Sequence, residues 1–505
     1  MKANALGASG GHQLPGHSAN SRGLTPPARY GSTWRPLVAA EDMVATAVVV
    51  GVTLLLAFTD GSRRLAWSFG GCAAIGLTLK LLLGPNLRVR YLTIPGAFLA
   101  AYFVLMSLAA VYVHGEMDHW VRDTYFLAMQ SVLVTFPLGV LAASGCFRGC
   151  AARVERYACE ALRVTTGDAR FSRLVIVVFW MAMGVAAVYV GASEFVPILK
   201  LAFDYSSQID DISLRFTVSE LPKVLLFCLA LARSLALPFC TLYLFMMSQV
   251  GGRRWRRDFV FVFAASTAIA CLSLERAPLM ALCGMLAFGV AIANMHRPLQ
   301  MRTVGALGVV AGLALGLAGF ISALQYDSEV TVAEVGDGVR HVVVNRVLLA
   351  SARASALAFE EFPTTEHQLG GRYVRMFNIV RGGEYLESRY APRLVILPVS
   401  FVGDLWRNWG WPAVLAGGAL IGFFSQCVQQ SLFVHKTVIS AVFQAILCLA
   451  FIWLIPGNAF GIVTTSLIVG GWVGGYAAIR RSTGDAFYDH IALPSAPVRG
   501  GRRLC

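Results

Sequence analysis

The sequence predicts an all-α polytopic membrane protein, with about 12 transmembrane helices and a large helical loop on the outer, periplasmic face. Of its 505 residues, 57% are hydrophobic and only 14% are charged, and the mean hydropathy is +0.64. Soluble domains carry about 25% charged residues, so this composition argues against a water-soluble protein. The apolar residues also gather in runs that approach the roughly 20 residues needed to cross the hydrocarbon core.

The chain divides into two tails, two groups of spans and one long loop. Residues 1–42 are rich in Gly, Ser, Pro and His, which predicts a disordered cytoplasmic tail. The first apolar run begins near Met43, too late for an ordinary cleaved signal peptide, so the first span is expected to act as the insertion signal. Residues 43–324 hold helices 1–9, residues 411–479 hold helices 10–12, and residues 480–505 form a second cytoplasmic tail. The predicted spans are 43–59, 65–84, 93–113, 124–144, 173–193, 223–248, 258–274, 277–295, 303–324, 411–430, 437–456 and 459–479.

The distribution of basic residues predicts the orientation of these spans. With the N-terminus inside, the inner segments hold most of the arginines, which agrees with the positive-inside rule. This alternation leaves the C-terminus in the cytoplasm and places residues 325–410 outside. The net charge of +14 is therefore explained by basic residues at the inner membrane surface. Binding to nucleic acid is not expected, because no basic stretch is long enough to follow a phosphate backbone. The inner basic residues are Arg22, Arg29, Arg35, Arg88, Arg90, Arg148, Arg153, Arg156, Arg163, Arg170, Arg173, Arg253, Arg254, Arg256, Arg257, Arg297, Arg302, Lys436, Arg480 and Arg481.

The outer loop is rich in arginine. Residues 326–393 contain eight arginines and no lysine. Each arginine would cost about 2.5–3.5 kcal/mol at the centre of a spanning helix, so this segment cannot cross the membrane. Its apolar spacing predicts a helix from Asp337 to Glu361, followed after Pro363 by a turn-rich piece with paired glycines.

Arginines are the main candidates for substrate binding. The planar guanidinium binds phosphate oxygens in bidentate fashion and stays charged at any relevant pH. A cluster of them suits a lipid diphosphate or an anionic sugar chain. Nine acids in the same loop leave a solvated, salt-bridged segment as an equal alternative. The predicted substrate-binding residues are Arg215, Arg233, Arg340, Arg346, Arg353, Arg375, Arg381 and Arg393.

Four further residues have special positions. Arg276 lies in the SLERAPLM hairpin between two apolar spans, although its pairing with Glu275 can also simply mark the water boundary. Arg233 lies within a span, where an arginine is a functional-site hypothesis by default and a buried structural pair is the alternative. His341 and His367 are the histidines of the outer loop and are candidates for a general base, but each can equally be an ordinary loop residue.

No cofactor or metal site is predicted. The chain has no phosphate-binding loop, dinucleotide-binding glycine set or zinc-protease motif. Cys146 and Cys150 have no Cys or His partner at metal-ligand spacing. The outer loop contains no cysteine, so a disulfide framework is not expected.

The segment FVGDLWRNWGWPAVLAGGALIGFF, residues 401–424, resembles the pattern that closes the outer loop of membrane polymerases of oligosaccharide repeat units, the O-antigen polymerase (Wzy) type. The SLERAPLM hairpin and the long outer loop are similar to theirs, and Arg372 and Gly383 have the spacing of an Arg-x10-Gly motif. The resemblance covers about residues 200–480, but the usual Pro-Arg segment is matched only loosely, by Pro392 and Arg393. The motif residues at the end of the loop are Gly403, Asp404, Trp406, Asn408, Trp409 and Gly410.

The resemblance implies metal-independent glycosyl transfer at the outer face of the bacterial inner membrane, as in C-type membrane glycosyltransferases. Donor and acceptor would both be glycans on undecaprenyl diphosphate, and arginines would hold the departing diphosphate. Arg276 and Arg372 are expected to act in catalysis, with His341, His367 and Asp404 as candidate bases. The expected partners are the lipid-linked oligosaccharide, membrane lipids, a chain-length regulator and a flippase, with no cofactor and no nucleic acid.

Two other functions stay open. An O-antigen ligase, which transfers finished glycan to the lipid A core, usually has a catalytic histidine in its large outer loop. A flippase or transporter of lipid-linked sugars would not be an enzyme. Transporters concentrate polar groups near the membrane midplane, where this chain has mainly Lys80 and Arg233.

Overall fold

The computed structural model describes residues 92–147, 150–192, 222–272, 276–295, 332–340, 348–362, 399–456 and 462–483, with single positions within 68–76, 305–319 and 343–344. The chain divides into two units, Met1–Ala45 and Thr46–Cys505, and every described residue belongs to the second unit. The predicted spans 43–59, 65–84 and 303–324 therefore lie outside the described residues, apart from those single positions.

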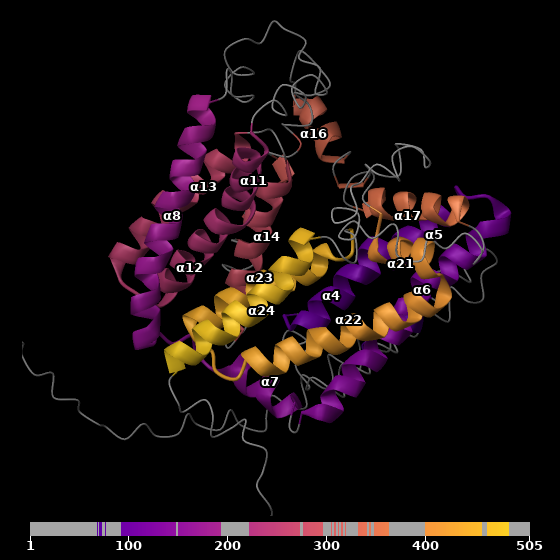
Figure 1. Ribbon diagram of the computed structural model, residues 1–505, viewed down its shortest axis with the longest axis horizontal. Coiled ribbons are helices and arrows are strands. Elements are labelled where there is room, and N and C mark those ends of the chain that lie inside the picture. Colours follow the sequence, from indigo (N-terminus) through magenta and orange to yellow (C-terminus); the bar gives the residue numbers. More distant parts are fainter. Residues whose placement is uncertain are drawn as a thin grey trace, which may run out of the picture. The chain divides into compact units, whose positions relative to one another are not determined.

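Nearly all of the described residues lie in helices (Figure 1). Two of the long helices contain a π-helical turn: α4, η1 and α5 are continuous from Ile94 to His114, and α11, η2 and α12 are continuous from Lys223 to Val250. The elements are α4 Ile94–Tyr102, η1 Phe103–Leu108, α5 Ala109–His114, α6 His119–Cys146, α7 Cys150–Cys159, α8 Thr166–Ala192, α11 Lys223–Leu231, η2 Ala232–Ala236, α12 Leu237–Val250, α13 Arg253–Cys271, α14 Arg276–Ala293, α16 Val332–Arg340, α17 Ala350–Glu361, α21 Phe401–Trp409, α22 Trp411–Leu432, α23 Val438–Trp453 and α24 Ile462–Thr483.

Five of the described helices are long and apolar enough to cross a membrane. Their outward surfaces carry exposed apolar side chains, such as Val177 and Met181 on α8 and Leu420 on α22. Such a surface would be unfavourable in water but is expected against lipid tails. The chain is therefore a helical membrane protein, as predicted. The five helices cover Ile94–His114, Trp120–Cys146, Phe171–Ala192, Val224–Val250 and Trp411–Leu432, and the shorter apolar helices Pro278–Ala293 and Val438–Trp453 accompany them.

Helices α6 and α22 run side by side (Figure 1), and their close packing depends on small residues. A Cβ atom added to Gly139 would collide with the carbonyl group of Ala419, and one added to Gly422 would collide with the carbonyl group of Phe136. Small residues allow two spanning backbones to approach, which is how helices associate inside a membrane. These glycines explain why α6 and α22 run side by side.

Helix α4 packs on α22, and α23 joins α4 to the other helices. It contacts α4 on one side and α12, α14 and α24 on others, and it is buried along nearly its whole length. Its Gln444 donates to the carbonyl oxygen of Leu92, and Gln429 of α22 accepts from the backbone nitrogen of Ile94. Both contacts satisfy backbone groups at the start of α4, which would otherwise be unpaired.

The loops separate into two groups at opposite ends of α6. At its start, the turn after α5 contacts α17 through Glu116 and Arg353. Beyond its other end, the segment after α7 pairs with the segment before α23, where Arg163 and Thr437 form an isolated β-bridge. The alternation of all the predicted spans, and the assignment of the second end to the cytoplasm, stay predictions.

The predicted helix from Asp337 to Glu361 is interrupted at Leu349, a bend that precedes α17. Before this bend the structure describes α16 up to Arg340 and π-helical backbone at positions 343, 344 and 348. In this stretch the backbone nitrogen of Leu349 donates to the carbonyl oxygen of Val344 at 2.9 Å, a bond of five-residue spacing. Val343 and Val344 are β-branched and therefore favour α-helix less than the residues on either side.

Candidate functional site

The structure describes four of the predicted site residues in full. Arg233 lies in η2, Arg340 ends α16, Arg353 lies in α17 and Asp404 lies in α21. Arg276 begins α14, but its side chain is not described. The other predicted site residues lie outside the described residues: Arg215, His341, Arg346, His367, Arg372, Arg375, Arg381 and Arg393.

Arg353 and Glu116 form a bidentate ion pair. The guanidinium donates from Nε to one carboxylate oxygen at 2.8 Å and from an Nη atom to the other at 2.7 Å. Both side chains stay about two-fifths exposed, at 41% and 42%. The hydrogen bond from Arg353 lowers the pKa of Glu116, and the same bond raises the pKa of Arg353. The pair is thus charged and accessible, with a guanidinium that can turn to another anion.

Helix α21 carries the motif that resembles the repeat-unit polymerases, and it is buried. Ser400 caps the helix by accepting from the backbone nitrogen of Gly403. One turn later, the guanidinium of Arg407 donates to the carboxylate of Asp404 in a buried ion pair. The amide of Asn408 donates to the carbonyl oxygen of Asp404 at 2.8 Å. Gly410 then ends the helix with a φ of 65°, which favours glycine and lets α22 begin immediately.

Asp404 was predicted as a candidate base. Its carboxylate is 7% exposed and is already bound by Arg407. This placement favours a structural or positioning contribution from Asp404, and the predicted proton transfer remains a prediction.

Helices α17 and α21 form one unit, called here the α17–α21 platform and comprising residues 350–362 and 399–409. The hydroxyl of Ser355 donates to the hydroxyl of Ser400 at 2.6 Å and accepts from its backbone nitrogen at 3.0 Å. The Trp406 indole donates to the carbonyl oxygen of Phe362 at 2.8 Å, and its ring stacks on Phe359 with centroids 4.5 Å apart. These contacts cross 45 residues of sequence and hold both ends of the intervening segment together.

The platform rests on the α5–α6 hairpin. Tyr125 of α6 is fully buried and donates to the carbonyl oxygen of Ala352 in α17 at 3.1 Å. Tyr125 also meets Phe359 edge to face, with centroids 5.4 Å apart. A helical carbonyl oxygen can accept this second hydrogen bond only from a limited range of directions. The bond therefore orients α17 with respect to α6.

A second polar pair lies in the same hairpin and was not among the predicted site residues. The Nε2 atom of His114, at the end of α5, is 3.2 Å from a carboxylate oxygen of Asp123. The histidine ring is 6% exposed and meets Phe126 edge to face, whereas Asp123 is 71% exposed. A histidine oriented by a carboxylate is a common arrangement for proton transfer. The turn HGEMDHWVRD between two apolar runs was the available sequence signal.

Arg233 lies apart from this hairpin, within the span Val224–Val250. Its side chain is 9% exposed, and it sits in the π-helical segment η2, which contacts α8, α13 and α14. Single π turns inside α-helices often occur at functional sites. The prediction that Arg233 is a functional intramembrane residue is therefore compatible with its surroundings.

The α17–α21 platform and the α5–α6 hairpin thus hold three carboxylates, a histidine and two arginines: Glu116, Asp123, Asp404, His114, Arg353 and Arg407. Within the described residues, no group of three or more His, Cys, Asp or Glu side chains is arranged to hold a metal ion. The groups present suit anion binding by guanidinium and proton transfer by imidazole or carboxylate.

Comparisons with known proteins add no family to these observations. No protein-family model matches the chain, and neither the curated proteins nor the solved structures give a significant match.

Proposed function

We propose that this protein is a membrane glycosyltransferase that polymerises oligosaccharide repeat units carried on undecaprenyl diphosphate, at the outer face of a bacterial inner membrane. The product would be an O-antigen, capsule or exopolysaccharide. The observation that carries the proposal is the α17–α21 platform, because the motif resembling the polymerases packs there beside an accessible arginine, Arg353. The platform also lies at the end of a span, where a lipid-linked substrate would present its diphosphate.

The proposed reaction is a displacement at the anomeric carbon of the donor glycan. The acceptor hydroxyl oxygen forms the new glycosidic bond, the bond from the anomeric carbon to the diphosphate oxygen breaks, and undecaprenyl diphosphate leaves. Arg353 would exchange its Glu116 partner for the diphosphate and stabilise the charge that develops there. His114, oriented by Asp123, would take the proton from the acceptor hydroxyl. The predicted arginines Arg276, Arg346, Arg372 and Arg375 would contribute further contacts to phosphate or acidic sugar.

Complementation of a deletion strain tests this proposal. Arg353→Ala, Arg276→Ala and Arg372→Ala are expected to insert normally but to leave single repeats in place of a glycan ladder. Glu116→Gln is the matched control for Arg353, because it weakens the same ion pair and keeps the guanidinium. Long chains in Glu116→Gln together with their loss in Arg353→Ala would show that the guanidinium itself is needed.

Glycan chains of wild-type length in all three arginine variants would overturn the proposal that the protein is a polymerase. The deletion strain also separates the ligase alternative, because loss of ligation leaves long chains that are not attached to lipid A core.

A transporter of lipid-linked oligosaccharide is the second candidate, and Arg233 favours it. Transporters place polar groups at irregular turns within spans, and Arg233 lies buried in a π-helical turn. Purified protein in liposomes distinguishes the two candidates. Movement of the lipid-linked sugar across the bilayer, without new glycosidic bonds, would favour the transporter.

A further inference from the structure

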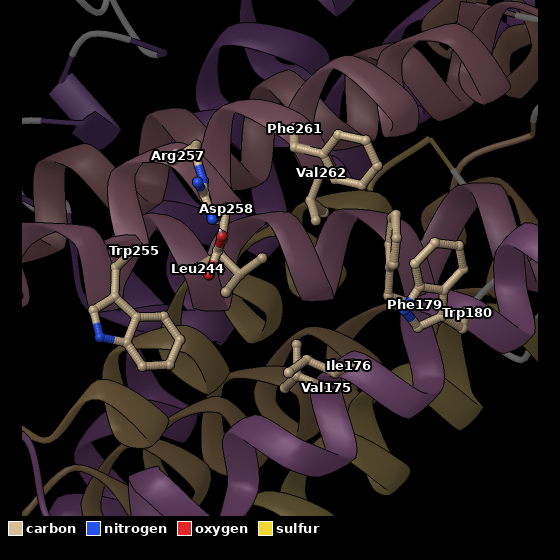
Figure 2. A pocket seen from close by; sticks show the side chains of 10 residues that line it. All are labelled: Val175, Ile176, Phe179, Trp180, Leu244, Trp255, Arg257, Asp258, Phe261 and Val262. Atoms are coloured by element: carbon tan, nitrogen blue, oxygen red, sulfur yellow. Dashed lines mark ion pairs between the residues drawn. The ribbon is translucent and has the colours of Figure 1, made fainter. Parts of the chain in front are cut away.

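An apolar groove lies between α8, α12 and α13, away from the α17–α21 platform (Figure 2). Its volume is about 400 Å³, which falls within the roughly 300–1,000 Å³ typical of small-molecule sites. Val175, Leu244 and Val262 form its buried floor. Phe179, Trp180 and Phe261 close one end, while the opposite end is polar.

The groove opens to the surface that faces lipid. Ile176, Trp180 and Phe261 line it and are 49%, 59% and 57% exposed. They belong to, or lie next to, the span Phe171–Ala192, most of whose surface is not covered by the rest of the described chain. A groove of this kind in a membrane is filled by hydrocarbon, because water is absent and the walls offer little to hydrogen-bond.

The polar end is strongly basic. Trp255, Arg257 and Asp258 line it, and they belong to the sequence RRWRRD that begins α13. Its four arginines, at positions 253, 254, 256 and 257, are all exposed, and Asp258 is the one acid among them, at 4.0 Å from Arg257. The stretch therefore has a net charge of +3, from four arginines and one aspartate.

The change from charge to apolar character along α13 coincides with the groove. After Asp258 the helix becomes apolar through Phe259, Val260 and Phe261. The charged turn is thus expected at the level of the lipid headgroups, with the apolar groove extending from it toward the hydrocarbon. The first turn of α13 has no side-chain cap, since its N-cap is Gly252, so its backbone N–H groups add to the positive field.

We propose that this groove binds an anionic diacyl phospholipid, with its phosphate at the α13 arginines and one acyl chain along the Val175–Phe261 wall. Arginines bind phosphate oxygens in bidentate fashion, and basic pockets between spanning helices bind anionic headgroups. The apolar groove selects a lipid over a soluble anion, and the net charge selects an anionic over a zwitterionic headgroup. This site is independent of the proposed glycosyl transfer.

Lipid retention by the purified full-length protein tests the proposal. The protein in detergent is titrated with phosphatidylglycerol or with phosphatidylcholine of the same chains, and bound lipid is counted by native mass spectrometry. Phosphatidylglycerol is expected to bind and to raise the melting temperature, whereas phosphatidylcholine and inorganic phosphate do neither. Equal retention of the two lipids by the wild-type protein would overturn the proposal.

Two pairs of variants locate the site. Arg256→Gln with Arg257→Gln is expected to weaken phosphatidylglycerol binding roughly 10- to 30-fold. Arg480→Gln with Arg481→Gln is its control, because those exposed arginines end α24 instead. An equal loss in both double variants would indicate a general charge effect and would refute a site on α13.

The groove itself is tested on α8. Ile176→Trp fills the groove and is expected to abolish retention of the lipid. Val177→Trp is the matched control, because the neighbouring Val177 is 54% exposed and does not line the groove. Wild-type affinity in Ile176→Trp would show that the acyl chain does not lie there.

Discussion

Replacing Gly139 of α6 with alanine tests whether backbone contact holds α6 against α22. The new Cβ atom would overlap the carbonyl carbon and oxygen of Ala419, which belong to the backbone of α22. No rotamer change can relieve an overlap with backbone, so the two helices must move apart. The contact is central to the fold because α6 and α22 pack along much of their length.

The expected magnitude follows from two opposing effects. Overpacking a well-packed contact typically costs about 1–3 kcal/mol. Replacing a helical glycine with alanine gains about 0.5–1 kcal/mol from the lower backbone entropy of the unfolded chain. Gly184→Ala in α8 is the matched control, because that position is exposed and a Cβ atom there meets nothing within 4 Å. Both variants share this gain, so they are expected to differ in stability by the overlap alone, roughly 1–3 kcal/mol, with opposite signs relative to the wild type when the overlap exceeds the gain.

Thermal unfolding of the purified protein in one detergent measures this difference. The fraction that remains monodisperse after heating should fall for Gly139→Ala and stay level or rise for Gly184→Ala. Equal changes in melting temperature for Gly139→Ala and Gly184→Ala would refute the close contact between α6 and α22. A lower melting temperature for both variants would refute the reasoning that a Cβ atom is tolerated at the open position of α8.

Three further outcomes are expected. Burial lowers the pKa of Lys436 to about 8, so its folded-state pKa lies below the unfolded value of 10.5. The folded state then binds fewer protons than the unfolded state between these two pKa values, so stability rises with pH through that window. Lys436→Met should therefore stabilise the protein most below pH 8, and melting curves from pH 7 to 10 would show this. A double-mutant cycle on Glu116 and Arg353 should give a coupling of only about 0.2–1 kcal/mol, because both side chains are partly exposed, and a much larger coupling in denaturation would contradict this. Arg407→Met should destabilise by about 3–5 kcal/mol, because it removes the guanidinium that donates to the buried carboxylate of Asp404, and adding Asp404→Leu should recover part of that loss in the same melting assay.

Much of the helical layout could be predicted from hydropathy. The predicted span 411–430 corresponds to α22 at Trp411–Leu432, and the predicted span 223–248 corresponds to the helix from Lys223 to Val250. Each spanning helix satisfies its own backbone hydrogen bonds, so the local sequence determines where it begins and ends. Hydropathy could not show the π turn at η2, which depends on how α8, α13 and α14 pack around it.

The candidate site was predictable only in part. Arg353 and the motif of α21 were identified from the sequence, but Glu116 and His114 were not. The ion pair of Glu116 with Arg353 joins residues 237 positions apart, and no local pattern marks such a partner. Asp404 was predicted as a candidate base because of its place in the motif, whereas its partner Arg407, one turn away, could have been inferred from helical spacing.

The burial of Lys436 also could not be predicted from the local sequence. Lys436 was predicted as one of many inner-face charges, yet its side chain is fully buried and its Nζ lies 6.0 Å from the centre of the Tyr157 ring. That environment depends on the segment after α7 pairing with the segment before α23. A charge next to an apolar run therefore does not reveal by itself whether water reaches it.

By itself, the sequence determined that this is a helical membrane protein, because a lipid solvent imposes hydrophobic length segment by segment. The tertiary structure alone decided which helices touch, where the helical segment before α17 is interrupted, which carboxylate holds Arg353 and where an apolar groove meets the arginines of α13. Those features arise from contacts between segments far apart along the chain. Their energies depend on shape and burial, which no single stretch of sequence contains.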